Sequence, residues 1–425
     1  MDISGAADIL TWNKWVFSFL GIWPLDDSNK LFLFHYIYFM IHTCLEYVEL
    51  FKYLNNLEYV VANLTENLVI TLTFLKISAY RINKNELRKM SNDINDDFKE
   101  ESYKDSEEKA LFLEYNAIAQ KFMKVGIPIT LIAAVLYYLR PLTGHVIVDT
   151  SHLGNTSHSY IMPYRITLFF EITNFQMYVF MYAFEILNVP IIAFGFIGTD
   201  CLLITLVLHL CGQLAVLSHQ VRNLTMNPQN FQNEFRVIVM KHLRLIRISK
   251  SLDTAFNQIL IQQLVGMSLL LCLAGYNLIA MSDSGQNVHL ITFIFYACSV
   301  SMLLFAYCLI GEYLINESTK IQDAFYNSTW YNRPPYQLEL FLICMVFVQR
   351  PLVLTAGKIY SLSLSTFARN YSRRQSGKLV MFIFYALTII VQLLGYCFIG
   401  ECLISEVNCR TFVREILIMN YCTFD

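Results

Sequence analysis

The residues that could carry a function are aromatic and sulfur-containing side chains set into long apolar runs. Small apolar ligands are bound mainly by shape and burial, with a few polar groups that fix their orientation. Burial contributes about 25 cal/mol per Å², so a small volatile molecule can gain several kcal/mol without a charged partner. The sequence predicts a ligand pocket in the outer halves of the runs, with these candidates: Tyr137, Tyr138, Phe170, Phe175, Tyr178, Cys272, Tyr276, Phe293 and Tyr296. For each single residue, packing against protein or lipid is the competing interpretation.

A second group of informative residues lies in the stretch Arg350–Phe367. Pro351 and Gly357 in an apolar setting mark a break between two helical pieces, and small hydroxylated residues follow them. Serine and threonine on a membrane helix can line water or satisfy freed backbone groups. The composition is typical of either a kinked packing helix or a helix that lines a pore. In the second case the pore residues are Thr355, Gly357, Ser361, Ser363, Ser365 and Thr366.

Acidic residues also occur at or near membrane depth, namely Glu66, Glu171, Glu185 and Asp200. Charged groups are expensive there and usually face protein or water. The functional interpretation is that they belong to a polar pocket or a permeation path. The structural interpretation is that they lie at the membrane interface or in a buried hydrogen-bonded pair. Of these we favour the structural interpretation.

No arrangement typical of an enzyme stands out. The sequence holds no defensible Ser/His/Asp order, no Gly-rich phosphate loop and no His-x-x-x-His. His145, His152 and His158 share one loop, but their spacing matches no common zinc pattern. We therefore expect no catalytic residues, no metal site and no cofactor. In the same loop, Asn155 begins a glycosylation sequon.

The composition is that of a membrane protein. The chain has 425 residues, of which 56% are hydrophobic and 15% charged, whereas a soluble protein carries about 25% charged residues. The net charge of −2 and the lack of a basic tract argue against nucleic acid as a partner. The 11 cysteines lie mostly in apolar runs, which is typical of packed apolar residues rather than a disulfide framework. Membrane lipid is thus an expected partner.

Eight apolar runs approach the roughly 20 residues that a helix needs to cross a membrane. They are Leu31–Phe51, Val60–Tyr80, Phe122–Leu139, Phe169–Phe194, Ile259–Met281, Leu290–Ile315, Leu338–Ala368 and Leu379–Ile404. The loop Arg81–Lys124 carries nine Lys or Arg and His219–Lys250 carries six, whereas the loops assigned to the outside carry two or fewer. Basic loops stay in the cytoplasm, so the N-terminus is predicted to be intracellular. The expected fold class is an all-α polytopic membrane protein.

The fourth run is too long for a single crossing. Ile166–Gln220 is 55 residues of mostly apolar chain, and a straight helix of that length would run roughly 80 Å. We predict one span, kinked near Pro190, that continues as a helix into the cytoplasm. His209, Gln213 and Gln220 would share one face of this extension. The fifth segment is expected to extend in the same way, so that the extensions form a helical bundle under the membrane.

The C-terminal pattern resembles a known family. Pro351-x-x-Leu354-Thr355-Ala356-Gly357 followed by Leu362-Ser363-Leu364-x-Thr366-Phe367 is similar to the last transmembrane segment of insect odorant receptors. Other residues also resemble this family. In the fourth segment they are Asp200, Leu208-His209 and Gln213-Leu214. At the end of the sixth segment and after it they are Gly311-Glu312, Trp330 and Pro334-Pro335. The resemblance covers roughly Trp12–Phe367.

The resemblance implies seven transmembrane helices with an intracellular N-terminus. It implies an olfactory receptor subunit that binds a small hydrophobic odorant among spans two to six and gates a cation channel. The implied partner is the shared odorant receptor co-receptor, in a hetero-oligomer, a tetramer, in the plasma membrane of a sensory neuron dendrite. A gustatory-type chemoreceptor channel is the alternative, against which the Leu362-Ser363-Leu364-x-Thr366-Phe367 pattern speaks. A membrane transporter is a more distant alternative, because a transporter would show a polar, repeat-related site at the midplane.

The tail departs from the family after Phe367. Arg369–Lys378 adds four cations, which cannot line a hydrophobic gate. Phe382–Glu406 then repeats the sixth span, with 14 identities in 25 to Phe293–Glu317 at a constant offset of 89 residues. Our hypothesis is that one receptor, lacking its last turns, is joined to a fragment of a tandem neighbour; an expressed variant is the alternative. We divide the chain into a cytoplasmic N-terminal segment (1–30), a receptor-like transmembrane region with cytoplasmic extensions (31–368), and an atypical tail with an eighth apolar span (369–425).

Overall fold

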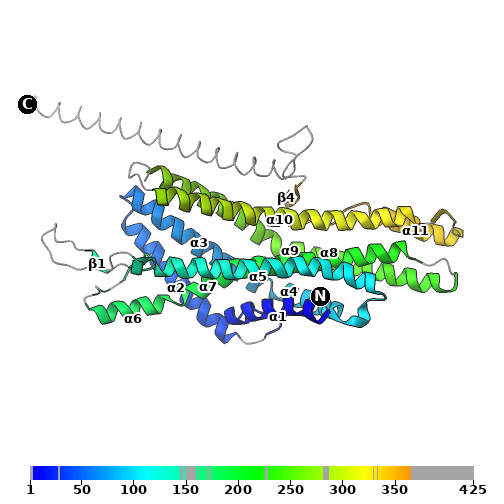
Figure 1. Ribbon diagram of the computed structural model, residues 1–425, viewed down its shortest axis with the longest axis horizontal. Helices are drawn as coiled ribbons and strands as arrows, with labels where there is room; N and C mark the ends of the chain where they lie inside the picture. The colour runs from blue at the N-terminus through cyan, green and yellow to red at the C-terminus, as the bar shows by residue number, and fades with distance from the viewer. Residues whose placement is uncertain are drawn as a thin grey trace, which may run out of the picture.

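The structure is a computed structural model of the chain. It describes residues 3–26, 29–143, 147–148, 159–160, 162–168, 170, 172, 174–224, 228–280, 287–328, 330–332 and 334–364. The described part is an elongated bundle of helices (Figure 1). The tail, the duplicated span and Asn155 lie outside these residues, so the domain division and the glycosylation site stay predictions.

The membrane-spanning helices agree with the first six apolar runs. The helices of the first half are α1 (Ile3–Leu20), α2 (Lys30–Lys52), α3 (Leu57–Ile82), α4 (Lys84–Asn95) and α5 (Ser106–Thr143). The second half has α6 (Phe175–Glu185), α7 (Asn188–Ala193), α8 (Thr199–Arg222), α9 (Pro228–Ala280), α10 (Asn287–Asn327) and α11 (Pro335–Phe347). Among the described residues, five stretches are long and apolar enough to cross a membrane: 30–52, 59–82, 106–139, 175–222 and 231–276. Helix α10 contains the sixth run, Leu290–Ile315. The all-α membrane fold is thus confirmed.

Short elements connect these helices. The 3-10 turns η1 (Asp96–Phe98) and η2 (Glu100–Ser102) join α4 to α5, and η6 (Trp330–Asn332) precedes α11. Strands β1 (Ile147–Val148) and β2 (Ser159–Tyr160) pair antiparallel, with Ile147 opposite Tyr160. Strands β3 (Thr355–Ala356) and β4 (Tyr360–Ser361) form a second antiparallel pair, with Ala356 opposite Tyr360. Figure 1 shows α6 and β1 at one end of the long axis and α11 at the other.

Helix α8 is the centre of the bundle. Every residue from Thr199 to Ser218 is buried, and α8 packs against α5, α9 and α10. A helix that is mostly apolar on every side needs protein around it, and α8 is mostly apolar from Thr199 to Ser218. The predicted continuation of the fourth and fifth segments as long helices is confirmed. Helix α9 alone has 53 residues, about 80 Å at 1.5 Å per residue, against about 30 Å of hydrocarbon.

The predicted kink near Pro190 is also confirmed. Helix α6 ends at Glu185, and the chain passes through α7, which contains Pro190, into a π-helical turn, η4 (Phe194–Gly198), before α8 begins. Proline cannot donate the backbone hydrogen bond that a straight helix requires. The break therefore separates an outer piece, α6, from the buried central helix.

The predicted polar face of α8 contacts the segment that connects α4 to α5 and the start of α5, through residues 97–108. Nε2 of His209 lies 3.1 Å from Oδ2 of Asp97, and Nε2 of Gln213 donates to the Tyr103 hydroxyl at 2.9 Å. About two turns further on, Gln220 donates to Oε1 of Glu108 at 2.9 Å. The three side chains share one face, as expected, and their partners all come from residues 97–108.

Asp97 is the charged centre of this connection. Arg244 of α9 donates to both of its carboxylate oxygens at 2.8 Å. Burial alone would raise the pKa of Asp97, but the hydrogen bonds and charges of His209 and Arg244 outweigh it and hold the pKa below its usual range. The carboxylate therefore stays ionised at neutral pH and ties α8 and α9 to η1.

We expect Asp97→Asn to lower the free energy of unfolding by about 2 kcal/mol at neutral pH, because Arg244 and His209 lose their anionic partner. The figure is modest because the Arg244 side chain is 31% exposed and solvent screens the pair. Folding lowers the pKa of Asp97, so its carboxylate stabilises the folded state fully at pH values above the unfolded pKa of about 3.9. This stabilisation is lost as the pH falls from there through the folded pKa. Thermal unfolding in detergent at pH 7 measures the change. Asp96→Asn, at an exposed neighbour, is the control; equal losses in both variants would contradict the argument.

The break predicted at Pro351 and Gly357 is present, but it is a hairpin and not a kink between two helical pieces. Helix α11 ends at Phe347, and Thr355–Ser361 forms a hairpin rather than a helix. The turn needs two left-handed residues, Gly357 at φ 61° and Lys358 at φ 58°, a conformation that glycine adopts readily. The hairpin is then held by α9: Asp253 accepts from the backbone and hydroxyl of Thr355 at 2.7 Å each.

Candidate functional site

Four of the sequence-predicted pocket residues come together at the outer end of α5 and α6. The rings of Tyr138 and Tyr182 are 4.8 Å apart, and Tyr178 lies 5.6 Å from Tyr182. Phe175 is 6.3 Å from Tyr178, and Tyr137 is 5.8 Å from Tyr164. These contacts join α5, α6 and the segment before α6 into one aromatic cluster.

The other five candidates are placed less closely. Cys272 and Tyr276 are partly buried near the C-terminal end of α9, and Phe170 is 46% exposed. The side chains of Phe293 and Tyr296, in α10, lie outside the described residues. The structure therefore brings together the tyrosines of the third and fourth spans but not the whole predicted set.

Buried acids lie next to the aromatic cluster. The carboxylate of Glu185 accepts from the backbone N–H of Tyr164 at 3.3 Å. On α2, Nδ1 of His42 is 3.3 Å from Oε1 of Glu46, and the His42 ring stands edge-on to Tyr164 at 5.3 Å. His42, Glu46 and Glu185 are all buried. We call the set Tyr38, His42, Glu46, Tyr138, Tyr164, Tyr178, Tyr182 and Glu185 the outer cluster.

The α2 residues of this cluster are not among the sequence-predicted site residues. Glu46 lies inside the first apolar run, and an ionisable residue inside a span is by default a functional-site candidate. That signal could have found it. Tyr164 and Tyr182 carry no comparable signal, because tyrosine is common throughout this chain.

A second set of contacts holds the segment 162–168 against α2 and α3. The Thr167 hydroxyl donates to Glu49 at 2.6 Å, and the Tyr59 hydroxyl donates to the same carboxylate at 2.9 Å. Arg165 lies 3.7 Å from Glu66 and over the Tyr59 ring. These contacts place Tyr164 between α2, α5 and α6.

Several polar atoms in the outer cluster have no hydrogen-bond partner among the described residues. They are Oε1 of Glu185, both carboxylate oxygens of Glu46 and both ring nitrogens of His42; the side-chain amide of Asn188, next to the cluster, likewise has none. Buried polar groups are nearly always paired with protein or water, and leaving one unpaired is costly. The cluster therefore has the capacity to bind a further polar group.

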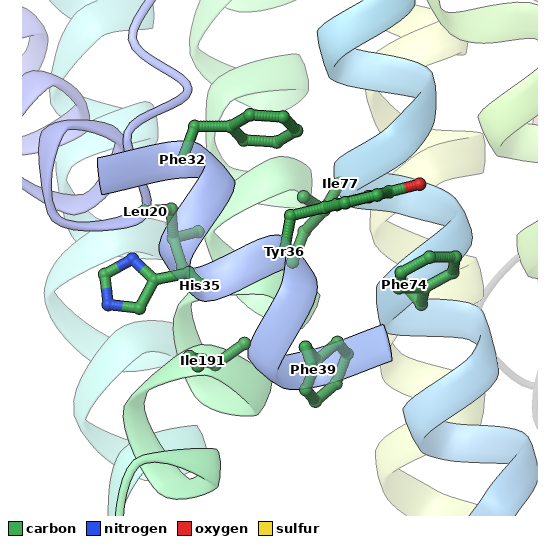
Figure 2. A pocket seen from close by; sticks show the side chains of 8 residues that line it. All are labelled: Leu20, Phe32, His35, Tyr36, Phe39, Phe74, Ile77 and Ile191. Carbon is green, nitrogen blue, oxygen red and sulfur yellow. The ribbon is translucent and has the colours of Figure 1, made fainter. Parts of the chain in front are cut away.

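A small cavity lies between α1, α2, α3 and α7 (Figure 2). It is lined by Leu20, Phe32, His35, Tyr36, Phe39, Phe74, Ile77 and Ile191. Its volume is about 10 Å³, enough for about one water molecule, whereas ligand pockets typically measure about 300–1,000 Å³. The cavity is apolar and cannot hold an odorant in this conformation.

Two larger, open cavities lie on the predicted cytoplasmic side. One of 510 Å³ lies beside Asp97, Lys241, Arg244 and Arg247, and burial lowers the pKa of Lys241 to about 8. The other, of 350 Å³, lies between α5 and α10 beside Tyr115 and Glu317. Both are rich in charged side chains, so neither suits a small apolar ligand.

Asp200 has the structural role that we favoured. Its carboxylate lies 2.8 Å from Nζ of Lys76 on α3, and both side chains are 2% exposed. Lys76 also donates to the Phe196 carbonyl of η4 at 3.1 Å, and Tyr80 donates to the Thr199 carbonyl at 2.7 Å. The pair ties α3 to the start of the central helix, so Asp200 is not free to contact a ligand.

Comparison with known proteins decides the family. A family model described as "7tm Odorant receptor" matches residues 56–370. The chain belongs to the odorant receptor family. The match ends close to Phe367, where the resemblance of the sequence to the family also ends.

Individual odorant receptors are similar over much of the chain. Odorant receptor 13a of Drosophila melanogaster is 23% identical over 391 residues, which is 82% of this chain and 88% of that receptor. Odorant receptor 49a of the same species is 26% identical over 238 residues, and that match spans 55% of this chain and only 59% of the relative.

The fold is that of a solved insect olfactory receptor. The structure of OR5 from Machilis hrabei in complex with eugenol matches with a TM-score of 0.68 and 15% identity, covering 91% of this chain and 99% of that one. At this identity the match establishes the fold. The chain is accordingly a multi-pass membrane protein of a receptor family.

Proposed function

We propose that this chain is an olfactory receptor subunit that binds a small volatile odorant and gates a cation channel together with the family's co-receptor. The observation that carries the proposal is the odorant receptor match over residues 56–370. The fold shared with an insect olfactory receptor that was solved with eugenol supports it. Membership of the odorant receptor family also favours this function over a gustatory-type receptor or a transporter.

The proposed odorant site is the outer end of the bundle. Its candidate residues in the outer cluster are Tyr138 and Tyr178, and those next to the cluster are Tyr137 and Phe175. Cys272 and Tyr276 on α9 would complete the site. Because the aromatic side chains there pack against one another, odorant must favour a second conformation in which the site is open. Only a ligand that binds one state better than the other shifts the equilibrium between them.

The proposed pore follows the hairpin. Thr355, Gly357 and Ser361 belong to the hairpin that α9 and α10 hold, so we assign them to anchoring rather than to the pore lining. Ser363 is buried, and Ser365 and Thr366 lie outside the described residues. We propose that these last residues lead into the pore-lining span, so that movement of α9 or α10 reaches the pore through the hairpin.

The proposed setting is the plasma membrane of a sensory neuron dendrite. There the chain would assemble with the co-receptor into a tetramer, surrounded by membrane lipid and glycosylated at Asn155. The large exposed apolar side chains near α11, among them Tyr326, Val346 and Phe347, suit subunit contacts of this kind. Large apolar surfaces of monomers commonly mark interaction sites.

Current recording with a broad odorant panel tests the proposal. Cells would express the co-receptor with this chain, or with a variant in which residues 368–425 are replaced by the last span of a related receptor. We expect odorant-evoked current from the variant at least, and no such odorant response from cells with the co-receptor alone. Silence of both, with surface expression verified by labelling, would contradict the channel function. Current from the variant alone would show that the tail is defective.

A further inference from the structure

We propose that the outer cluster recognises a small protonated amine, with Glu185 and Glu46 as the anionic partners and the surrounding tyrosines as an aromatic cage. The inference rests on the proposed function and deepens it by naming the chemical class of the ligand. It stands on three features of the cluster: buried carboxylate oxygens that accept no hydrogen bond, aromatic rings around them, and the lack of a Lys or Arg partner among the described residues.

The first feature is the state of the two carboxylates. Glu185 is 0% exposed and Glu46 is 1% exposed. Oε1 of Glu185 and both oxygens of Glu46 have no hydrogen-bond partner in the described structure. Glu46 lies within electrostatic range of both Glu66 and Glu185, so the three acids lie near one another. A buried cluster of acids at membrane depth is stabilised strongly by a cation.

The second feature is the arrangement of the tyrosines. Tyr38, Tyr138, Tyr164, Tyr178 and Tyr182 all lie close enough to Glu185 for its charge to act on them. The hydroxyls of Tyr38 and Tyr138 donate to the carbonyls of Phe184 and Tyr182 respectively. These hydroxyls are thus occupied, so a ligand would contact the aromatic rings instead. Aromatic faces beside a carboxylate attract ammonium groups, as in methyl-lysine cages.

The third feature is the distribution of basic side chains around the site. Arg165, which lies nearby, pairs with Glu66 and packs over Tyr59. Lys76 is held at the other end of α3 by Asp200. In the described residues, the one basic group within 4 Å of either acid is His42, beside Glu46. Within the described part of the chain, the two acids therefore share a single histidine, and Glu185 has no basic partner within 4 Å.

A neutral odorant would fit this site less well. An alcohol or ester can donate at most one hydrogen bond to a carboxylate and leaves its charge unpaired. An alkylammonium donates three hydrogen bonds and carries the opposite charge. Charge-assisted hydrogen bonds are about twice as strong as neutral ones. Phe39, one turn before His42 on α2, and Ile191 line the small apolar cavity (Figure 2). They would receive a short alkyl chain, which limits the ligand to a small amine.

Ligand-dependent thermal shift tests the inference without channel current. The detergent-solubilised full chain would be heated with butylammonium chloride, 1-butanol or sodium chloride at pH 7. We expect butylammonium to raise Tm, and to bind at least about tenfold more tightly than butanol. Glu185→Gln, which keeps the shape and can still accept from the Tyr164 N–H, should abolish that preference. Equal effects of amine and alcohol, or an unchanged preference in Glu185→Gln, would overturn the proposal.

Two further variants keep the test decisive. Glu46→Gln should also reduce the preference for the amine, which covers the case in which Glu185→Gln does not fold. Glu86→Gln, in the exposed part of α4, should leave it unchanged. Loss of the preference in Glu86→Gln would also contradict a specific site.

Odorant-evoked current separates failure of this inference from failure of the proposed function. Current evoked by neutral odorants but not by amines, together with no thermal shift by butylammonium, would refute the amine site and leave the receptor function intact. A specific thermal shift without current from any odorant would support the site and contradict the channel function.

Discussion

Lys76→Met is expected to remove most of the receptor from the cell surface. Methionine keeps the length of the side chain but leaves Asp200 as an unpaired acid, 2% exposed, at the start of the central helix. Removing one member of a buried ion pair costs about 3–5 kcal/mol, a large fraction of the roughly 5–15 kcal/mol that stabilises a folded protein. Surface biotinylation and thermal unfolding of the solubilised protein both measure the loss.

The double variant Lys76→Met/Asp200→Leu provides the sharpest check. Replacing both members of a buried pair with apolar residues is often neutral, so surface expression should recover substantially. Tyr307 on α10 also bonds to Asp200, and its unpaired hydroxyl will keep the recovery incomplete. Lys89→Met, at an exposed pair with Glu86, should have little effect. If the double variant is as poor as Lys76→Met, charge imbalance is not the cause.

Gly311→Ala is expected to abolish most odorant-evoked current at near-normal surface expression. A Cβ at Gly311 of α10 would lie 2.1 Å from the carbonyl oxygen of Leu362. That oxygen belongs to the backbone of the segment that follows the hairpin, and Leu362 is 0% exposed. The segment must therefore move away from α10, and the bond from the Leu364 N–H to Glu312, 3.1 Å long, would be strained or lost. Overpacking of this kind costs about 1–3 kcal/mol.

Current per surface receptor, measured with the chain carrying a restored last span, is the relevant quantity. We expect it to fall by at least about tenfold, which corresponds to about 1.4 kcal/mol in the gating equilibrium. Gly126→Ala is the matched control, because its Cβ would meet Ile197 at an ordinary 3.6 Å. Normal current in Gly311→Ala would show that the hairpin does not transmit movement of α10 to the pore.

Local patterns in the sequence determined where the helices lie. Apolar runs of about span length predicted α2, α3 and the membrane parts of α5, α9 and α10, because hydrophobicity over 20 residues is a property of the chain alone. Pro190 predicted the break in the fourth segment for the same reason: the missing N–H belongs to the residue itself. The spacing of His209, Gln213 and Gln220 predicted a common face, since helical periodicity depends only on position along the chain.

Only the tertiary structure decided which of these residues meet. Glu46 and Glu185 are 139 positions apart, and their proximity depends on the packing of α2 against α7 and on the segment that carries Tyr164. The partner of Asp200 could not be named from the sequence, because Lys76 reaches it across an interface between two helices. The hairpin at Thr355–Ser361 was missed because its apolar and hydroxylated residues also suit a helix. Its hydrogen bonds to α9 and the carbonyl packed on Gly311 settle the conformation, and those contacts exist only once the bundle has formed.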